Sequence, residues 1–241
     1  MTDRRDEISH NLTAVRERIA AACAEAGRSA DEVTLTVVTK FFPVSDVLLL
    51  ADLGIRDVGE NRHQEAESKA AQTQGVGLRW HFIITLKSNK AHAVATYADV
   101  VESIDRPKLL KGLGAGAIER NVMIDCLVQV NLDPADGTAP VGRSTAGRGG
   151  AAPADVVQLA EQVAAADGLR LRGVMGVAPV DQHPAPAFET LAALAAQVRL
   201  IDPAATVISA GMSGDLEAAI LAGATHVRIG SAVLGRRPTI K

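Results

Sequence analysis

Residues 33 to 40 read Val-Thr-Leu-Thr-Val-Val-Thr-Lys, and the rest of the sequence is interpreted outward from this stretch. Apolar residues alternate with threonine over most of it, which is typical of a strand that buries one face. Residues 41 to 43, Phe-Phe-Pro, close the strand, and residues 44 to 53 have helical periodicity. Lys40 therefore falls at the carboxyl end of a strand, where parallel α/β folds place their chemistry. Position alone favours a solvated loop lysine over a reactive one.

Strand-type and helix-type segments alternate over the whole chain. The expected strands are residues 33–40, 55–59, 79–84, 99–104, 122–131, 169–177, 205–210 and 225–230. The expected helices between them are residues 44–53, 61–73, 88–96, 106–120, 154–166, 185–200 and 214–222. This alternation predicts an α/β fold, a single (β/α)8 TIM-type barrel, with an open doubly wound parallel sheet as the alternative.

An extra amino-terminal helix is expected at residues 6–26, where apolar residues recur at helical spacing and Gly27 follows. It would pack on the outside of the barrel. No linker separates two self-sufficient halves, so residues 1–241 are expected to form one domain. Residues 133–153 are rich in Gly, Ala, Pro, Ser and Arg and are expected to form a mobile loop after the fifth strand. Their glycines do not match the spacing of a nucleotide-binding loop.

Composition excludes several classes of function. With 25 basic and 28 acidic residues the net charge is −3, which provides no long-range attraction to nucleic acid or to a membrane surface. Aromatic residues, at 2%, offer little surface for stacking bases. No segment approaches the roughly 20 apolar residues of a membrane span or resembles a signal peptide. The two cysteines, Cys23 and Cys126, are expected to be buried and unpaired, which indicates a reducing, cytoplasmic setting, and no metal is expected.

The end of the seventh expected strand offers a place for an anion. Residues 209–215 read Ser-Ala-Gly-Met-Ser-Gly-Asp and lead into a helix. Glycines let backbone amides approach a ligand, and the first turn of a helix has unpaired N–H groups, so this segment is a candidate phosphate cradle. The alternative is that Ser213 only caps the helix.

The eighth expected strand, residues 225–230, supports the cradle. Its two apolar residues must face the surrounding helices, which turns His226 and Arg228 into the barrel. A buried arginine without a partner would cost on the order of 3 to 5 kcal/mol, so an internal carboxylate or a ligand should meet Arg228. Gly230 and Ser231 then open a short helix and add a second set of amides, next to the first strand when the barrel closes.

A lysine at a strand end, a phosphate cradle and an inward arginine together describe a site for a phosphorylated aldehyde. Lys40 can condense with the aldehyde as a Schiff base, the cradle can hold the phosphate, and Arg228 can hydrogen-bond a ring nitrogen. Pyridoxal 5′-phosphate carries an aldehyde, a phosphate and a ring nitrogen, and it is therefore the expected cofactor.

Short motifs in a specific order also resemble those of a known family. They are Val38-Thr39-Lys40, Gly59-Glu60-Asn61, Trp80-His81-Phe82-Ile83, Ser88-Asn89-Lys90, Gln129-Val130-Asn131, residues 211–219 (GMSGDLEAA) and residues 227–231 (VRIGS). Over nearly its whole length the chain resembles the YggS/PROSC family of pyridoxal phosphate homeostasis proteins. It departs from the usual pattern of that family after the third strand, where Ile84 replaces a glycine and Lys87 replaces a glutamine.

The resemblance implies a barrel related to the amino-terminal domain of alanine racemase and assigns roles by matching position. The cofactor would be bound to Lys40, with Asn61 beside it. Its phosphate would be held by Ser213, Gly230 and Ser231, and Arg228 would face its pyridine nitrogen. Two further residues are candidates to line the pocket: His81, for which a structural role is the alternative, and Met212, for which simple packing is the alternative.

Catalysis is less well supported than binding. Racemisation on pyridoxal phosphate needs two acid–base groups on opposite faces of the substrate, and Lys40 could be one. The racemases that this barrel resembles use a tyrosine from another domain and subunit, whereas the one tyrosine here, Tyr97, precedes the fourth strand. We therefore expect a monomeric protein that binds pyridoxal phosphate reversibly and buffers or delivers it, with apo-forms of pyridoxal phosphate enzymes as candidate partners. The alternatives are a low-activity amino-acid racemase and a Schiff-base sugar-phosphate aldolase.

Overall fold

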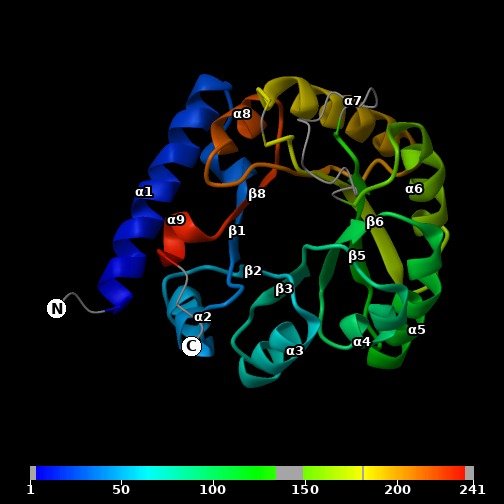
Figure 1. Ribbon diagram of the computed structural model, residues 1–241, viewed down its shortest axis with the longest axis horizontal. Helices are drawn as coiled ribbons and strands as arrows, with labels where there is room; N and C mark the ends of the chain where they lie inside the picture. Colours follow the sequence, from blue (N-terminus) through cyan, green and yellow to red (C-terminus); the bar gives the residue numbers. More distant parts are fainter. Residues whose placement is uncertain (1–3, 134–148, 181, 237–241) are drawn as a thin grey trace, which may run out of the picture.

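The computed structural model describes residues 4–133, 149–180 and 182–236 (Figure 1). Over these residues eight parallel strands form a closed barrel, in which each strand pairs with the next and β8 pairs with β1. The strands are β1 Thr34–Val38, β2 Asp57–Glu60, β3 Arg79–Phe82, β4 Val100–Ile104, β5 Ile124–Val130, β6 Leu169–Gly176, β7 Val207–Ser209 and β8 His226–Ile229. The predicted α/β barrel is confirmed, and the open sheet is excluded.

Helices surround the barrel on its outside (Figure 1). They are α1 Arg4–Glu25, α2 Val44–Asp52, α3 His63–Gln72, α4 Ala91–Ala95, α5 Leu110–Arg120, α6 Val156–Ala164, α7 Ala185–Ile201, α8 Leu216–Leu221 and α9 Ser231–Leu234. Short 3-10 turns occur at Ala30–Glu32, Ser88–Lys90, Pro107–Leu109 and Pro153–Asp155. Three expected helices, at residues 88–96, 106–120 and 154–166, therefore begin as 3-10 turns. In the second of them Pro107 occupies the first position, where the missing N–H costs no helical hydrogen bond.

The extra helix α1 is confirmed and lies along the outside of the barrel beside α8 and α9 (Figure 1). Its buried side chains are Ile8, Leu12, Val15, Ile19, Ala22 and Cys23. Polar contacts fix its position at both ends: Arg4 pairs with Asp46 on α2 at 2.6 Å, and Arg18 pairs with Glu217 on α8 at 2.7 Å. The helix is therefore tied to α2 and α8, which follow β1 and β7.

The register at the closing seam explains which side chains enter the barrel. Thr36 on β1 lies opposite Asp57 on β2 and Arg228 on β8. Partners in a sheet share a face, so these three side chains point the same way, while the buried Val37 and Val227 point toward the helices. The alternation seen in the sequence of strand eight is thereby confirmed.

The first strand is shorter than expected, because it ends at Val38 rather than at residue 40. A turn follows, in which the Phe42 N–H donates to the carbonyl oxygen of Thr39 at 3.0 Å and Phe41 has a φ of 70°. A positive φ cannot continue a strand. Lys40 thus belongs to the turn at the carboxyl end of β1.

Several other expectations concern the rest of the chain. Cys23 and Cys126 are buried and carry no disulfide. Most of the segment expected to be a mobile loop, residues 134–148, lies outside the described residues; beyond it, Ala151 pairs with Val130 as an isolated bridge. Among the helices that the structure describes, none has the length and apolar character to cross a bilayer.

Candidate functional site

A cavity of about 380 Å³ opens at the carboxyl ends of the barrel strands. It is lined by all six residues that the sequence assigned to a binding site: Lys40, Asn61, Ser213, Arg228, Gly230 and Ser231. They come from the turn after β1, the end of β2, the turn after β7, and from β8 and the residues that follow it. Segments nearly 200 residues apart in sequence meet here because β8 pairs with β1. Met212, a candidate lining residue, also borders the cavity.

The lining of this cavity combines positive charge with apolar side chains. Lys40 and Arg228 are its two cations, and none of its described lining residues is a carboxylate. Apolar side chains, among them Val38, Phe42 and Val177, complete the wall. A cavity of this kind fits a small anionic ligand that also carries an apolar ring.

Arg228 enters the cavity from β8 and is held on its inner side by the barrel. It donates to Ser209 Oγ at 2.6 Å and to the Gly176 carbonyl oxygen at 2.9 Å. The carboxylate of Glu102 lies 3.7 Å from the same guanidinium. Burial lowers the pKa of Arg228, and Glu102 opposes this effect by stabilising the charged form. The internal carboxylate that a buried arginine requires is therefore Glu102.

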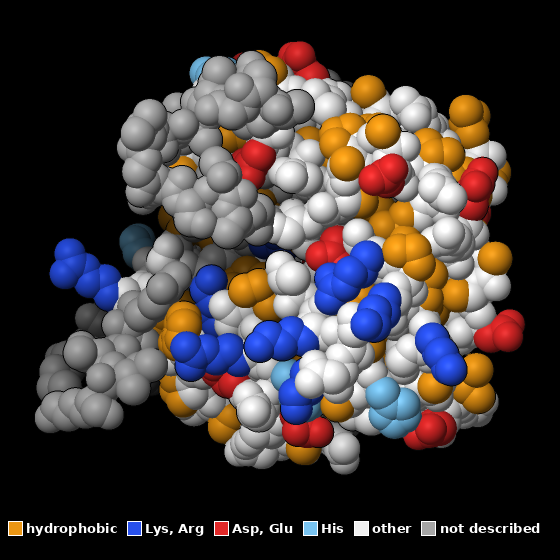
Figure 2. All heavy atoms as spheres, turned by 45° about the vertical axis from the view of Figure 1, so that its right-hand side comes forward, with side chains coloured by type: hydrophobic (Ala, Val, Ile, Leu, Met, Phe, Trp, Pro, Cys, Tyr) orange, Lys and Arg blue, Asp and Glu red, His pale blue; other side chains and the backbone are white. Residues whose placement is uncertain are grey.

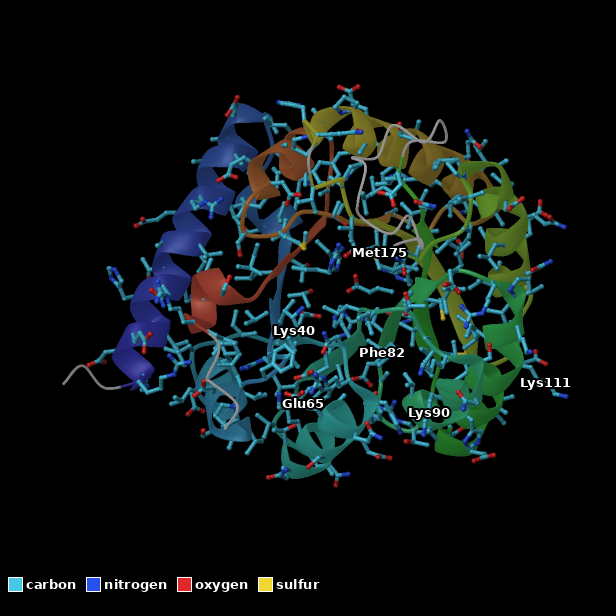
Figure 3. The ribbon with its side chains drawn as sticks, in the orientation of Figure 1. Lys40, Glu65, Phe82, Lys90, Lys111 and Met175 are labelled. Carbon is cyan, nitrogen blue, oxygen red and sulfur yellow. The ribbon has the colours of Figure 1, made fainter. Side chains whose placement is uncertain are left out.

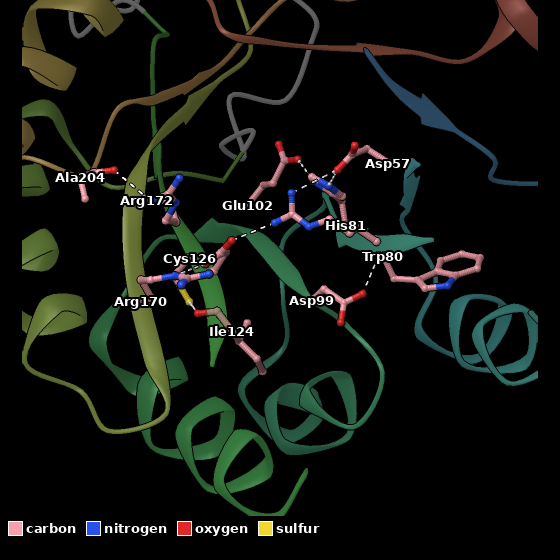
Figure 4. Close-up of polar contacts among 12 residues, drawn as sticks. Asp57, Trp80, His81, Asp99, Glu102, Ile124, Cys126, Arg170, Arg172 and Ala204 are labelled. Carbon is pink, nitrogen blue, oxygen red and sulfur yellow. Dashed lines mark hydrogen bonds and ion pairs between the residues drawn. The ribbon is translucent and has the colours of Figure 1, made fainter. Parts of the chain in front are cut away.

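His81 does not line the cavity, and the structural alternative describes it better. Its ring lies in the barrel interior between two carboxylates, with Nδ1 2.7 Å from Glu102 Oε1 and Nε2 2.9 Å from Asp57 Oδ1 (Figure 4). Burial alone would lower the pKa of His81, but the hydrogen bonds to Asp57 and Glu102 outweigh it and raise the pKa to about 9. His81 is thus a cation that compensates two buried anions beneath the site.

The geometry of the turn after β7 argues against the alternative that Ser213 only caps the following helix. The residue at the amino-terminal cap of α8 is Asp215, and its carboxylate accepts the Met212 N–H at 2.6 Å. Ser213 is therefore not the cap and lies in the cavity wall instead. Gly211 has a φ of 93°, and a Cβ there would lie 2.8 Å from Ala219, so only glycine allows the turn to pack against α8.

The turn after β8 brings the second glycine–serine pair to the cavity. Gly230 is the cap of α9, and Ser231 is the first residue of that helix. A Cβ at Gly230 would lie 3.2 Å from the carbonyl oxygen of Val38 on β1. The small residue therefore lets the backbone after β8 approach the backbone that leads to Lys40.

Asn61 carries an unused hydrogen-bond acceptor. Its Oδ1 atom is buried and has no hydrogen-bond partner among the described residues. Buried polar atoms are rarely left unsatisfied, so such an atom at a cavity indicates a missing ligand or water. The Asn61 backbone N–H donates to Glu60 Oε2 at 3.4 Å, which connects the residue to the charged cluster described next.

Sequence reasoning missed a charged cluster behind Lys40. Lys69 on α3 is buried and contacts the carboxylates of Glu60 at 2.6 Å and Glu65 at 2.7 Å. Glu60 belongs to one of the sequence motifs, but none of those motifs includes Lys69. The spacing of Glu65 and Lys69 by four residues on a helix was the available signal, although it usually marks an exposed ion pair.

The structure accommodates Ile84 and Lys87, the two residues after β3 that depart from the usual family pattern. Ile84 borders the cavity, is 43% exposed, and does not have the positive φ that would require glycine. Lys87 and Lys90 are exposed at the ends of the turn before α4, as expected for solvated charges.

Figure 2 shows lysine and arginine side chains gathered on one face of the molecule. Among the residues described, no group of three or more His, Cys, Asp or Glu side chains could hold a metal ion.

Known proteins resemble this chain over nearly its whole length. The family model "Alanine racemase, N-terminal domain" matches residues 5–238. The pyridoxal phosphate homeostasis protein of Mycobacterium tuberculosis H37Rv is 38% identical, over 98% of this chain and 95% of its own length. That of Escherichia coli K12 is 36% identical, over 96% and 97%. The chain belongs to the pyridoxal phosphate homeostasis protein family.

A solved structure from outside these relatives agrees with this family assignment. PipY of Synechococcus elongatus PCC7942, with pyridoxal phosphate bound, superposes with a TM-score of 0.78 at 28% sequence identity. The match covers 95% of this chain and all of PipY. This chain, a member of the pyridoxal phosphate homeostasis protein family, thus has the barrel that its sequence predicted. The family resemblance inferred from short motifs is confirmed.

Proposed function

We propose that this protein binds pyridoxal 5′-phosphate in the cavity, attached to Lys40, and buffers or delivers it rather than turning over a substrate. The observation that carries the proposal is the lining of the cavity. It combines a lysine, an arginine and two glycine–serine turns, without a carboxylate among its described residues. The cofactor bound to PipY and the name of the family support the choice of ligand.

The residues present fit this cofactor. Its phosphate is an anion, and the turns at Ser213 and at Gly230 and Ser231 offer hydroxyl and backbone N–H groups to it. Arg228 would face the ring nitrogen, and the unpaired Asn61 Oδ1 would meet a polar group of the ligand. When bound, the cofactor supplies an aldehyde, which condenses with the Lys40 amine with loss of one water molecule.

Two features support a carrier over an enzyme. Among the described lining residues, Lys40 is the one side chain suited to exchange a proton with a substrate. Tyr97 lies outside that lining, and burial raises the pKa of its hydroxyl well above the usual value. Arg228 remains charged beside Glu102, and a cation at the ring nitrogen disfavours protonation of that nitrogen, which weakens the ring as an electron sink.

A transfer assay tests this function. The protein loaded with pyridoxal phosphate is mixed with an apo-form of a pyridoxal phosphate enzyme, and recovery of that enzyme's activity is followed against free cofactor at equal concentration. We expect recovery from the loaded protein, together with negligible exchange of the α-proton across the common amino acids. Rapid exchange with one amino acid would establish the racemase alternative. Preferential covalent capture of a sugar phosphate would establish the aldolase.

A further inference from the structure

Lys69 is a buried lysine that contacts the backbone of the turn carrying Lys40. It projects from α3 and is 5% exposed. Its ammonium group donates to the carbonyl oxygen of Thr39 at 2.8 Å, to Glu60 Oε1 at 2.6 Å and to Glu65 Oε1 at 2.7 Å. All three donors of the ammonium group are therefore used inside the protein.

The cluster is costly to bury, which argues that its geometry matters. Lys69 and Glu60 are buried and Glu65 is partly buried, and removing such charges from water is compensated only by close and well-directed contacts. Burial raises the pKa of Glu60, and the hydrogen bond from Lys69 opposes this effect. Apolar side chains of similar volume would fill the same space without that cost, so packing alone does not explain the three charges.

The turn that the cluster holds has an unusual backbone. Phe41 has a φ of 70°, a conformation that bulky residues rarely adopt and that the third position of a type II turn requires. In this turn Lys40 occupies the second position, and the Phe42 N–H closes it onto Thr39 at 3.0 Å. An unfavourable conformation persists only where its surroundings fix it.

Contacts from α3 fix the turn on both sides of Lys40. The Phe41 N–H donates to Glu65 Oε1 at 2.7 Å, while Lys69 binds the carbonyl oxygen of Thr39. Figure 3 shows Lys40 and Glu65 on neighbouring segments. The guanidinium of Arg62 covers the Phe41 ring at 4.7 Å, which restrains the same residue from a third direction.

The cluster also contacts Asn61, a second residue that lines the cavity. Glu60 Oε1 accepts the Thr39 hydroxyl at 2.8 Å as well as Lys69, and Glu60 Oε2 accepts the Asn61 N–H at 3.4 Å. Glu60 thus contacts both the side chain that precedes Lys40 and the backbone of Asn61.

We propose that Lys69 and Glu65 are positioning residues, which hold the turn after β1 so that Lys40 is presented for covalent attachment of pyridoxal phosphate. This proposal rests on the proposed function. Condensation requires the amine and the aldehyde carbon to meet in a defined orientation, and small displacements slow such reactions strongly. The candidate phosphate turns follow β7 and β8, whereas the cluster contacts the turn after β1.

The test separates attachment from binding. The variants are Lys69→Met and Glu65→Ala, with Glu67→Ala as the matched control, because Glu67 lies on the exposed side of α3. Attachment is measured as the rate at which borohydride traps pyridoxal phosphate on Lys40, read by peptide mass. Binding is measured with pyridoxine 5′-phosphate, which carries an alcohol in place of the aldehyde. Circular dichroism checks folding, and Lys69→Met combined with Glu60→Gln serves if Lys69→Met alone does not fold.

We expect attachment in the Lys69 and Glu65 variants to slow by about tenfold or more, with affinity for the alcohol changed by less than roughly twofold and Glu67→Ala unaffected. Attachment at the wild-type rate would overturn the proposal. An equal loss of attachment and of alcohol binding would also overturn it, since the cluster would then be merely structural. Wild-type protein that binds the alcohol but never attaches the aldehyde would instead refute the proposed function itself.

Discussion

Arg228 donates a 2.6 Å hydrogen bond to the hydroxyl of Ser209, and that hydroxyl donates in turn to Glu102 at 2.6 Å. The relationship places a serine between a cation of the cavity wall and a carboxylate deep in the barrel. Glu102 then meets His81, and His81 meets Asp57 (Figure 4). The charge at the cavity is therefore supported by a continuous chain of buried side chains.

Removing the carboxylate in this chain should destabilise the fold. Glu102→Leu leaves Arg228 without its carboxylate and His81 without one of its two, so we expect a loss of about 3 to 5 kcal/mol in the free energy of unfolding, measured with urea. Glu119→Ala is the control, because this exposed residue pairs with His92 at the surface, and it should cost no more than about 1 kcal/mol. Equal small effects from the two variants would contradict the buried-chain account.

Stability should fall on both sides of a maximum near pH 6.5. The pKa of His81 is raised from 6.5 to about 9, so its contribution is complete below pH 6.5 and is lost as the pH rises through about 9. The pKa of His226 is lowered by burial from 6.5 to about 4, so its contribution is complete above pH 6.5 and declines as the pH falls toward 4. His81→Gln should flatten the alkaline side of the curve obtained from urea unfolding at a series of pH values. An unchanged alkaline slope in that variant would disprove the assignment.

The phosphate turns should determine the preference for the phosphorylated ligand. Combining Ser213→Ala with Ser231→Ala removes two hydroxyl donors, each worth about 1.5 kcal/mol or more toward a charged acceptor, so the dissociation constant for pyridoxal phosphate should rise about 100-fold or more. Affinity for pyridoxal, which has no phosphate, should change little. Ser45→Ala, at an exposed position on α2, is the matched control. If the double variant bound both ligands as the wild type does, the phosphate would lie elsewhere.

Asn61 should matter for the ligand and not for the fold. Its Oδ1 atom has no partner among the described residues, so Asn61→Ala removes no side-chain acceptor bond and should alter the free energy of unfolding by less than about 0.5 kcal/mol. Affinity for pyridoxal phosphate should fall several-fold, as measured by fluorescence titration. A large loss of stability with unchanged affinity would reverse this assignment.

Much of the fold could be predicted because its signals are local. Alternating apolar residues placed β1 and β8, and the same alternation turned Arg228 into the barrel, where it does lie. Six candidate site residues meet at one cavity because barrel topology brings the ends of distant strands together. Those contacts follow from the order of the strands and need no knowledge of side-chain packing.

The unpredicted features depend on tertiary contacts. Lys69 looks like an exposed helical residue in the sequence, and it is buried only because Thr39 and Glu60 approach it from two other segments. The sequence predicted an internal carboxylate or a ligand as the partner of Arg228 and did not identify it, since Glu102 lies on β4 across the barrel. The role of His81 likewise depended on which carboxylates surround it. No local pattern encodes these approaches.

The most direct test of the central claim is to map the covalent adduct. Wild-type protein is incubated with pyridoxal phosphate, reduced with borohydride, digested and analysed by peptide mass spectrometry. The account predicts one dominant modified residue, Lys40, and no comparable adduct in Lys40→Ala. A dominant adduct on another lysine, or an equal yield of modification in Lys40→Ala, would contradict it.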